Sequence, residues 1–273
     1  MRVLLTGAGG QLGRDLRRRL SQEEVEAREH GDLDIADRPG VFAEVERIRP
    51  DWIINAAAFN DVDAAESMEA EAFAVNADGP GNLAEAAARL GAAIVHVSTD
   101  YVFSGLKGSA YTEQDAPGPI NIYGRSKLKG EQRVLESGAE ALVLRTAWLY
   151  GRQGKNFVSV MLAAAARGER LRVVSDQVGS PTATADLADA VAGLIRSPAR
   201  GLIHAVNAGA ISRYEFARAI AGGRAEVEPI TSAEAPRPAL RPKNSALRSL
   251  RWSETGLPEM RPWQEALEEF LRT

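Results

Sequence analysis

The sequence predicts an α/β protein of the Rossmann type, in which helices cover both faces of a doubly wound parallel sheet. Short apolar runs alternate with helical stretches through the first half of the chain, which favours parallel strands joined by crossover helices. The runs are almost continuously apolar, as expected of strands that are covered on both faces. A glycine-rich loop lies between the first apolar run and the first helical stretch, the position it takes in dinucleotide-binding folds.

Hydrophobic periodicity places the individual elements. The expected strands of the first half are 2–6, 25–29, 51–57, 92–98 and 141–146. The expected helices are 11–20, a segment after Pro39 with Val41, Val45 and Ile48 on its buried face, 70–90 with a break near Gly79–Pro80, and 122–136. Beyond residue 150 the pattern loosens, and we expect strands at 170–174 and 202–206 and helices at 185–195 and 214–221.

This pattern divides the chain into two regions. Residues 1–150 are expected to form a dinucleotide-binding domain, completed by parts of 171–206. Residues 151–273 are expected to form mainly a smaller, partly irregular substrate-binding region. The reason is that residues 228–244 are rich in proline and polar side chains, which favour irregular backbone.

Composition excludes several classes of function. The chain has 273 residues, a formal net charge of −4 and no cysteine. Thiol nucleophiles, disulfides and cysteine zinc sites are therefore excluded, and an acidic balance does not favour nucleic acid as a partner. No apolar run reaches the roughly 18 residues that a membrane span needs. We expect a cytoplasmic protein without membrane or nucleic-acid partners.

The loop at residues 7–13 carries Gly7, Gly10 and Gly13 at intervals of three. Glycine allows a tight turn and close approach of the backbone to a pyrophosphate, which the following helix N-terminus attracts. The alternative is a glycine-rich turn without a ligand. An acidic residue about twenty positions further on would contact the adenosine ribose of NADH. Glu29, Asp32 and Asp34 all compete for that role, so the choice between NADH and NADPH stays open.

Tyr123 and Lys127 lie four positions apart at the start of a predicted helix, which places them on one face. An ammonium group near a phenol favours phenolate and lowers its pKa, so Tyr123 can exchange a proton with a carbonyl oxygen. Ser98 and Thr99 end the fourth predicted strand, where ligands of open α/β sheets bind. Strand alternation lets only one of these two hydroxyls face the tyrosine.

The glycine loop, the hydroxyl pair and the tyrosine–lysine pair together resemble the extended short-chain dehydrogenase/reductase family. From residue 1 to about 244 the chain also carries a series of strings in the order typical of its dTDP-4-dehydrorhamnose reductase branch. They are Asn55–Ala58, Val62–Glu66, Val75–Ala77, Ser98–Phe103, Leu144–Gly151, Asp176–Thr182 and Arg241–Ser245.

The resemblance implies reduction of the 4-keto group of dTDP-4-dehydro-L-rhamnose, with NADPH favoured over NADH as the hydride donor. It implies that Tyr123 donates the proton, that Lys127 binds the nicotinamide ribose and that Thr99 is the catalytic hydroxyl. The cofactor-binding residues it implies are Gly7, Gly10, Gln11, Leu12, Asp34, Ile35, Ala56, Ala57, Ala58, Tyr123 and Lys127. The substrate-binding residues it implies are Ser98, Thr99, Asp100, Tyr123, Trp148, Asn156 and Arg241.

Alternatives stay open for several of these residues. Ser98 and Thr99 could simply cap the end of the strand, and the Tyr123–Lys127 pair could be an ordinary surface pair of a helix. Trp148 could be a core residue, Asn156 could cap a helix that begins at Phe157, and Arg241 could be a solvated loop charge. The whole chain could also be another nucleotide-sugar reductase or epimerase. A third alternative is a non-catalytic subunit that resembles the regulatory subunit of methionine adenosyltransferase, although the intact Thr99, Tyr123 and Lys127 argue against it.

Magnesium is not expected. Some members of the resembled family are dimers linked by magnesium through glutamates, but this chain has Asp15 and Ala185 where those glutamates would lie. His30, His96 and His204 are scattered along the sequence and are interpreted as structural. We therefore expect no metal site, and either a monomer or a homodimer.

Overall fold

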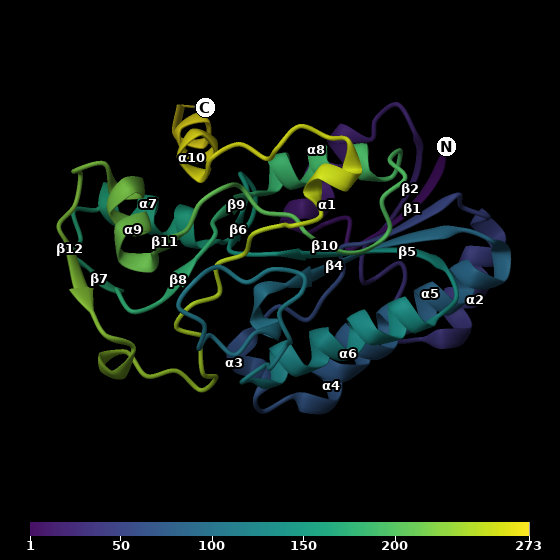
Figure 1. Ribbon diagram of the computed structural model, residues 1–273, viewed down its shortest axis with the longest axis horizontal. Helices are drawn as coiled ribbons and strands as arrows, with labels where there is room; N and C mark the ends of the chain where they lie inside the picture. Colours follow the sequence, from purple (N-terminus) through teal and green to yellow (C-terminus); the bar gives the residue numbers. More distant parts are fainter. Residues whose placement is uncertain (273) are drawn as a thin grey trace.

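A computed structural model describes residues 1–272, and its centre is a six-stranded parallel sheet in the order β10-β5-β4-β3-β1-β2 (Figure 1). The order reverses after β2, because the chain returns to the other side of β1 to form β3. In open α/β sheets such a reversal leaves a crevice at the carboxyl ends of the strands. The strands are β1 (Arg2–Thr6), β2 (Glu24–Arg28), β3 (Trp52–Asn55), β4 (Ala93–Thr99), β5 (Glu140–Thr146) and β10 (Gly201–His204).

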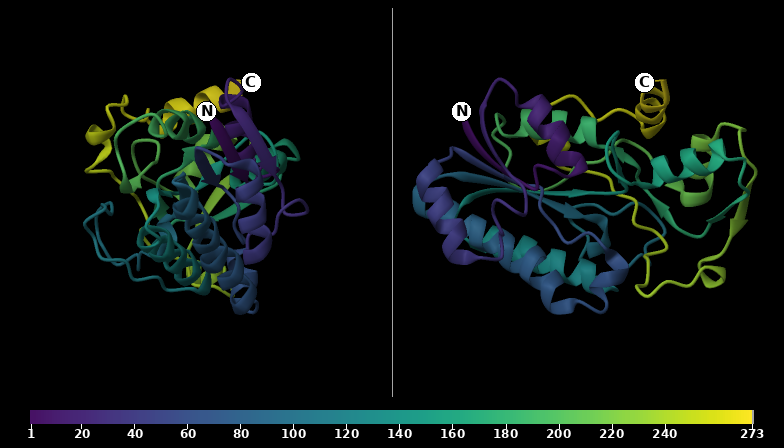
Figure 2. Two further views of the ribbon diagram at one scale, coloured as in Figure 1. Left: turned by 90° about the vertical axis from the view of Figure 1, so that its right-hand side faces the viewer. Right: turned by 180° about the vertical axis from the view of Figure 1, so that it is seen from behind.

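Helices cover both faces of this sheet, which confirms the predicted doubly wound fold. Figures 1 and 2 show α1 (Gln11–Arg19) and α8 (Thr184–Leu194) on one face. On the other face lie α2 (Arg38–Ile48), α5 (Gly79–Leu90) and α6 (Ile122–Glu136). Neighbouring residues of β1, β3, β4 and β5 enter opposite cores, so that both faces of these strands are buried, whereas the edge strand β2 is only partly buried.

The predicted apolar stripe of α2 is confirmed, since Val41, Val45 and Ile48 are all buried in the core beneath that face. The predicted helix 70–90 is interrupted earlier than expected. It consists of α4 (Glu69–Phe73), a π-helical turn at Ala74–Asp78, and α5. The interruption therefore begins before Gly79–Pro80, at residues that carry no helix-breaking side chain.

The π-helical turn fixes the position of α6. Buried Asn76 in this turn donates to the Ser126 hydroxyl at 3.1 Å. A Cβ atom on Gly130 would lie 2.1 Å from the Asn76 carbonyl oxygen. Only glycine therefore lets α6 approach so closely, and this approach sets where the first turn of α6 meets the sheet.

Most of the chain after β5, with α8 and β10 excepted, forms a smaller region beside the carboxyl ends of the strands, at the left of Figure 1. Its longer elements are α7 (Phe157–Ala166), β7 (Leu171–Val174), α9 (Arg213–Ala221), β12 (Val227–Ile230) and α10 (Trp263–Arg272). Its two-residue strands are β6 (Leu149–Tyr150), β8 (Val178–Gly179), β9 (Thr182–Ala183) and β11 (Ile211–Ser212). The expected strand 202–206 joins the main sheet as β10, whereas 170–174 becomes β7 and pairs with β12 outside it.

A buried ion pair ties α6 to the sheet. Arg145 of β5 donates to both Glu131 carboxylate oxygens of α6, at 2.9 and 2.6 Å. The Ser98 hydroxyl of β4 also donates to Glu131, at 2.5 Å. Glu131 and Arg145 are only 2% and 3% exposed, so neither charge can turn to solvent if its partner is lost.

The variant Glu131→Gln should lower the free energy of unfolding by about 3–5 kcal/mol, because removal of one partner leaves a buried, uncompensated charge. Glu254→Gln is the matched control, since Glu254 pairs with Arg251 at the surface, where an ion pair contributes about 0–1 kcal/mol. Urea denaturation of both variants measures the difference. Equal small losses in the two variants would contradict the structural role of the buried pair.

Candidate active site

A cavity of about 310 Å³ opens at the carboxyl ends of β1, β3, β4 and β5. It brings together side chains from the glycine-rich loop, the end of β4 and the start of α6. Eleven of the residues that sequence reasoning singled out line it: Gly10, Gln11, Leu12, Ala56, Ala58, Ser98, Thr99, Asp100, Tyr123, Lys127 and Trp148.

The glycine-rich loop forms one wall of this cavity and leaves no room for other residue types. Gly7 has a φ of +70°, and a Cβ there would lie 2.5 Å from the backbone nitrogen of Ala57. A Cβ on Gly13 would lie 2.2 Å from the Gly7 carbonyl oxygen. No side chain caps the first turn of α1 at Gly10. Free backbone N–H groups at a helix start suit a phosphate.

The start of α6 places Tyr123 beside the end of β4. Asn121 caps the helix by accepting a hydrogen bond from the Gly124 nitrogen at 2.7 Å. A Cβ on Gly124 would lie 2.2 Å from the Tyr101 carbonyl oxygen, so glycine permits this close packing. The Thr99 hydroxyl acts on the Tyr123 phenol as a hydrogen-bond partner that lowers its pKa, and both side chains line the cavity. Of the two hydroxyls at the end of β4, Thr99 therefore meets the tyrosine.

Ser98 and Asp100 have different partners. The Ser98 hydroxyl is engaged with Glu131, as strand alternation predicts for the neighbour of Thr99. Thr99 donates to the Asp100 carboxylate at 3.0 Å. Burial raises the pKa of Asp100 to about 6, although hydrogen bonds from Ser245 and Thr99 act in the opposite direction.

Lys127 is buried at the bottom of the cavity, with only 2% of its surface exposed. Its Nζ donates to the Val97 carbonyl oxygen at 2.7 Å. Burial lowers the pKa of Lys127 to about 8, and the negative charge of Glu131 opposes that shift. The expected lowering of the Tyr123 pKa is wrong for this structure, because burial of the phenol raises its pKa above the ordinary value. Desolvation is the largest cause of this rise, the charge of Asp100 adds to it, and hydrogen bonding to Thr99 opposes it.

A second cavity, of about 500 Å³, lies on the side of the smaller region and is rich in arginine. Its lining includes Tyr101, Phe157, Met161, Arg172, Val174, Gln177, Arg213, Arg237 and Arg241. Burial raises the pKa of the Tyr101 phenol, and the neighbouring Arg213 and Arg241 oppose that rise. Arg241 also pairs with Asp63, whose Oδ2 lies 3.0 Å from Nη2. Arg241 is therefore held by the protein and is not a freely solvated loop charge.

Trp148 separates the two cavities. It lines the first cavity, and the Arg213 guanidinium of the second lies 3.5 Å from the centroid of its ring. The backbone of Trp148 has a φ of +47°, which is uncommon for a bulky residue. Sequence reasoning missed Arg213, which no pattern distinguishes from the many other arginines of the chain.

The remaining predicted residues lie outside both cavity linings. Asn156 caps α7 by accepting from the Ser159 nitrogen at 3.0 Å, which confirms the helix-cap alternative. Its amide donates to Gln11 at 2.9 Å and so braces the loop behind the first cavity. Asp34 is exposed and accepts from the Ala36 nitrogen at 2.9 Å, whereas Ile35 is buried in the core. Gly7 and Ala57 lie in close backbone contact with each other, outside the cavity lining.

No group of three or more histidine, aspartate or glutamate side chains within residues 1–272 could hold a metal ion. Asp15, the position considered for magnesium, accepts a hydrogen bond from the Thr184 hydroxyl at 2.5 Å and pairs with Arg18 at 2.9 Å. In the same described part of the chain, no helix is long and apolar enough to cross a membrane.

Residues 1–273 match the family described as RmlD substrate binding domain. The chain belongs to the RmlD family. It is 48% identical to the dTDP-4-dehydrorhamnose reductase of Mycobacterium tuberculosis, over 97% of this chain and 91% of that protein. A probable dTDP-4,6-dihydroxy-2-methyloxan-3-one 4-ketoreductase of Streptomyces antibioticus is 45% identical over 98% of this chain and 94% of its own length.

A solved structure supports the same family as the sequence relatives of this RmlD-family protein. The dTDP-4-dehydrorhamnose reductase of Bacillus anthracis, in complex with NADP, superposes with a TM-score of 0.96 and 40% identity, covering 100% of this chain and 99% of that one. These relatives confirm the predicted class of enzyme, an NAD(P)H-dependent oxidoreductase.

The variant Asp100→Asn should stabilise the protein at pH 7 relative to the wild type and lose most of that advantage at pH 4.5. The folded-state pKa of Asp100, about 6, lies above the ordinary value of 3.8 for an aspartate, so ionisation of this carboxyl destabilises the fold as pH rises through that window. Denaturation of both proteins at both pH values should show that the substitution raises the free energy of unfolding by about 1–3 kcal/mol more at pH 7 than at pH 4.5. An advantage that is independent of pH would contradict a buried, titrating Asp100.

Proposed function

We propose that this protein reduces the 4-keto group of dTDP-4-dehydro-L-rhamnose and releases dTDP-L-rhamnose. The observation that carries the proposal is the pairing of Thr99 and Tyr123 in the lining of the glycine-loop cavity, next to the arginine-rich one. One cavity suits a dinucleotide and the other suits a nucleotide sugar. A ketone held at their boundary would meet both a hydride donor and a proton donor.

A reduced nicotinamide dinucleotide, held by the glycine-rich loop and Lys127, supplies the hydride. Tyr123 then gives its phenolic proton to the oxygen that develops negative charge. Burial raises the pKa of this phenol, so the proton stays in place until an alkoxide forms. Thr99, which lines the same cavity as the phenol, is placed to orient the same oxygen. General acid catalysis of this kind contributes about 10²–10⁴-fold to the rate.

Lys127 has a positioning role as well as a binding role. An ammonium group carries three donors, and one of them is used by the Val97 carbonyl oxygen. The other two donors remain available to bind a ribose hydroxyl and an acceptor beside Tyr123. Since the pKa of Lys127 is about 8, the side chain is still mostly charged at neutral pH.

The arginine-rich cavity fits the diphosphate of a nucleotide sugar. Arg172, Arg213, Arg237 and Arg241 all line it, and an arginine fork binds phosphate oxygens in pairs. The aromatic rings of Tyr101 and Phe157 lie in the same lining and offer flat surfaces to a base. Because the Streptomyces relative is named for a different 4-keto sugar, such a sugar is the main competing substrate. Product analysis by NMR distinguishes the two substrates.

The variant Tyr123→Phe should lower kcat by about 10²–10⁴-fold while it leaves cofactor binding nearly unchanged, because only the proton donor is lost. The assay follows loss of nicotinamide absorbance in the presence of dTDP-4-dehydro-L-rhamnose. Tyr214→Phe is the matched control, because Tyr214 belongs to α9 and lines neither cavity. Full turnover by Tyr123→Phe would exclude the proposed mechanism.

The variant Arg213→Met should raise KM for the nucleotide sugar by about 10–100-fold, since loss of a charge-assisted contact to phosphate costs about 1.5–3 kcal/mol. Affinity for the nicotinamide cofactor should not change. Arg218→Met removes the same charge from the exposed side of α9 and serves as the control. If both variants keep the wild-type KM, the arginine-rich cavity is not the substrate site.

A further inference from the structure

The carboxylate of Glu29 lies directly against the glycine-rich loop. Glu29 is the first residue after β2. The carbonyl oxygen of the preceding Arg28 accepts a hydrogen bond of 3.1 Å from the Ala8 nitrogen in the loop. A Cβ atom built on Gly9 would lie only 2.7–2.9 Å from the three carboxyl atoms of Glu29. The space that a side chain at position 9 would fill is therefore occupied by a negative charge.

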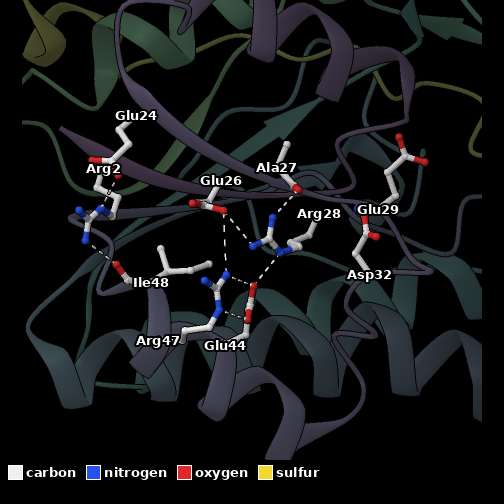
Figure 3. Close-up of polar contacts among 10 residues, drawn as sticks. All are labelled: Arg2, Glu24, Glu26, Ala27, Arg28, Glu29, Asp32, Glu44, Arg47 and Ile48. Atoms are coloured by element: carbon white, nitrogen blue, oxygen red, sulfur yellow. Dashed lines mark hydrogen bonds and ion pairs between the residues drawn. The ribbon is translucent and has the colours of Figure 1, made fainter.

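The structure separates the three acidic candidates that the sequence left open. The Asp32 carboxylate accepts from the Glu29 backbone nitrogen at 3.0 Å, and that of Asp34 accepts from Ala36 at 2.9 Å. Both carboxylates therefore serve the local turn. The exposed Glu29 carboxylate has no hydrogen-bond or ion-pair partner in the part of the chain that the structure describes, residues 1–272. Figure 3 shows it pointing away from the neighbouring arginine cluster.

Arg28, the basic residue closest in sequence, is fully engaged elsewhere. Its Nε donates to Glu44 at 2.6 Å, its Nη2 to Glu26 at 2.9 Å and its Nη1 to the Ala27 carbonyl oxygen at 2.8 Å (Figure 3). The side chain is only 18% exposed. A hydrogen bond from Arg47, together with that from Arg28, lowers the pKa of Glu44 to about 2. The positive charges of Arg28 and Arg47 are thus balanced by the negative charges of Glu26 and Glu44. The charge of Glu29 is left uncompensated.

Arg14 is the other cation beside the loop, and it too is engaged. Its Nε donates to the Gly9 carbonyl oxygen and its Nη1 to the Gln153 side chain, both at 2.8 Å. A 2′-phosphate on the adenosine ribose would add nearly two negative charges next to Glu29. Such a group is normally accommodated by a nearby arginine, whereas an acidic residue here binds the 2′-hydroxyl of NADH.

We propose that Glu29 makes this enzyme select NADH over NADPH, a selection that rests on the dinucleotide role proposed above for the glycine-rich loop. The carboxylate accepts hydrogen bonds from the ribose hydroxyls and repels a 2′-phosphate. The selection is opposite to the one that family resemblance favours, and it follows from this chain's own residues at the end of β2.

Isothermal titration calorimetry of the cofactor-free protein tests the proposal without relying on turnover. Wild-type protein should bind NADH at least about tenfold more tightly than NADPH, which corresponds to about 1.4 kcal/mol. Glu29→Gln should shrink this ratio by about tenfold, because it removes the repulsion but keeps the size of the side chain. Glu24→Gln, an equal change of charge at the far end of β2 from the loop, should keep the wild-type ratio. ADP-ribose and its 2′-phosphate should reproduce the difference, since they carry only the adenosine end.

Three results would overturn the proposal. Wild-type protein that binds NADPH as tightly as NADH would contradict it, and loss of that NADPH binding in Arg14→Ala would then assign the phosphate to Arg14. An unchanged ratio in Glu29→Gln would show that another group discriminates. Failure of the wild type to bind either dinucleotide would refute the proposed function itself, an outcome distinct from a preference for NADPH.

Discussion

The ion pair between Glu131 and Arg145 holds α6 against the sheet, and the geometry of the candidate site depends on that placement. Buried pairs of this kind often contribute little net stability, because desolvation offsets the attraction between the charges. Their removal is costly all the same, and their fixed geometry determines where the attached elements lie. Here the pair joins the helix that carries Tyr123 to the strand next to the one that ends in Thr99. Close contacts at Gly124 and Gly130 complete the same constraint, since neither position has room for a Cβ.

The same constraint explains the two pKa shifts at the site. A helix packed this closely buries Lys127 almost completely and covers part of Tyr123, which lines the cavity. Desolvation then lowers the pKa of the amine and raises that of the phenol. For reduction of a ketone this arrangement is useful, because the tyrosine must hold its proton until negative charge appears on the substrate oxygen. A freely exposed tyrosine and lysine at the same spacing would have neither property.

Much of this architecture could be predicted from the sequence, because local signals and tertiary packing agree there. Continuous apolar runs predicted the strands of the main sheet, and the expected helix 122–136 matches α6. The sequence did not predict α7, whose residues apart from Ser159 are all apolar and show no helical period, although its Asn156 cap was considered. The two-residue strands escaped prediction because such short pairings leave no periodic pattern. The role of Arg213 could not be read either, because it depends on Trp148 and Tyr101, which are distant in sequence.

Transfer of label from the cofactor to the product tests the central claim most directly. Reduced nicotinamide dinucleotide carrying deuterium on the transferred position would be incubated with the enzyme and dTDP-4-dehydro-L-rhamnose, and the sugar product analysed by NMR. The account predicts deuterium on the former ketone carbon, with the hydroxyl proton exchangeable with water. Oxidation of the cofactor without deuterium at that carbon, or with the label at another position of the sugar, would contradict it.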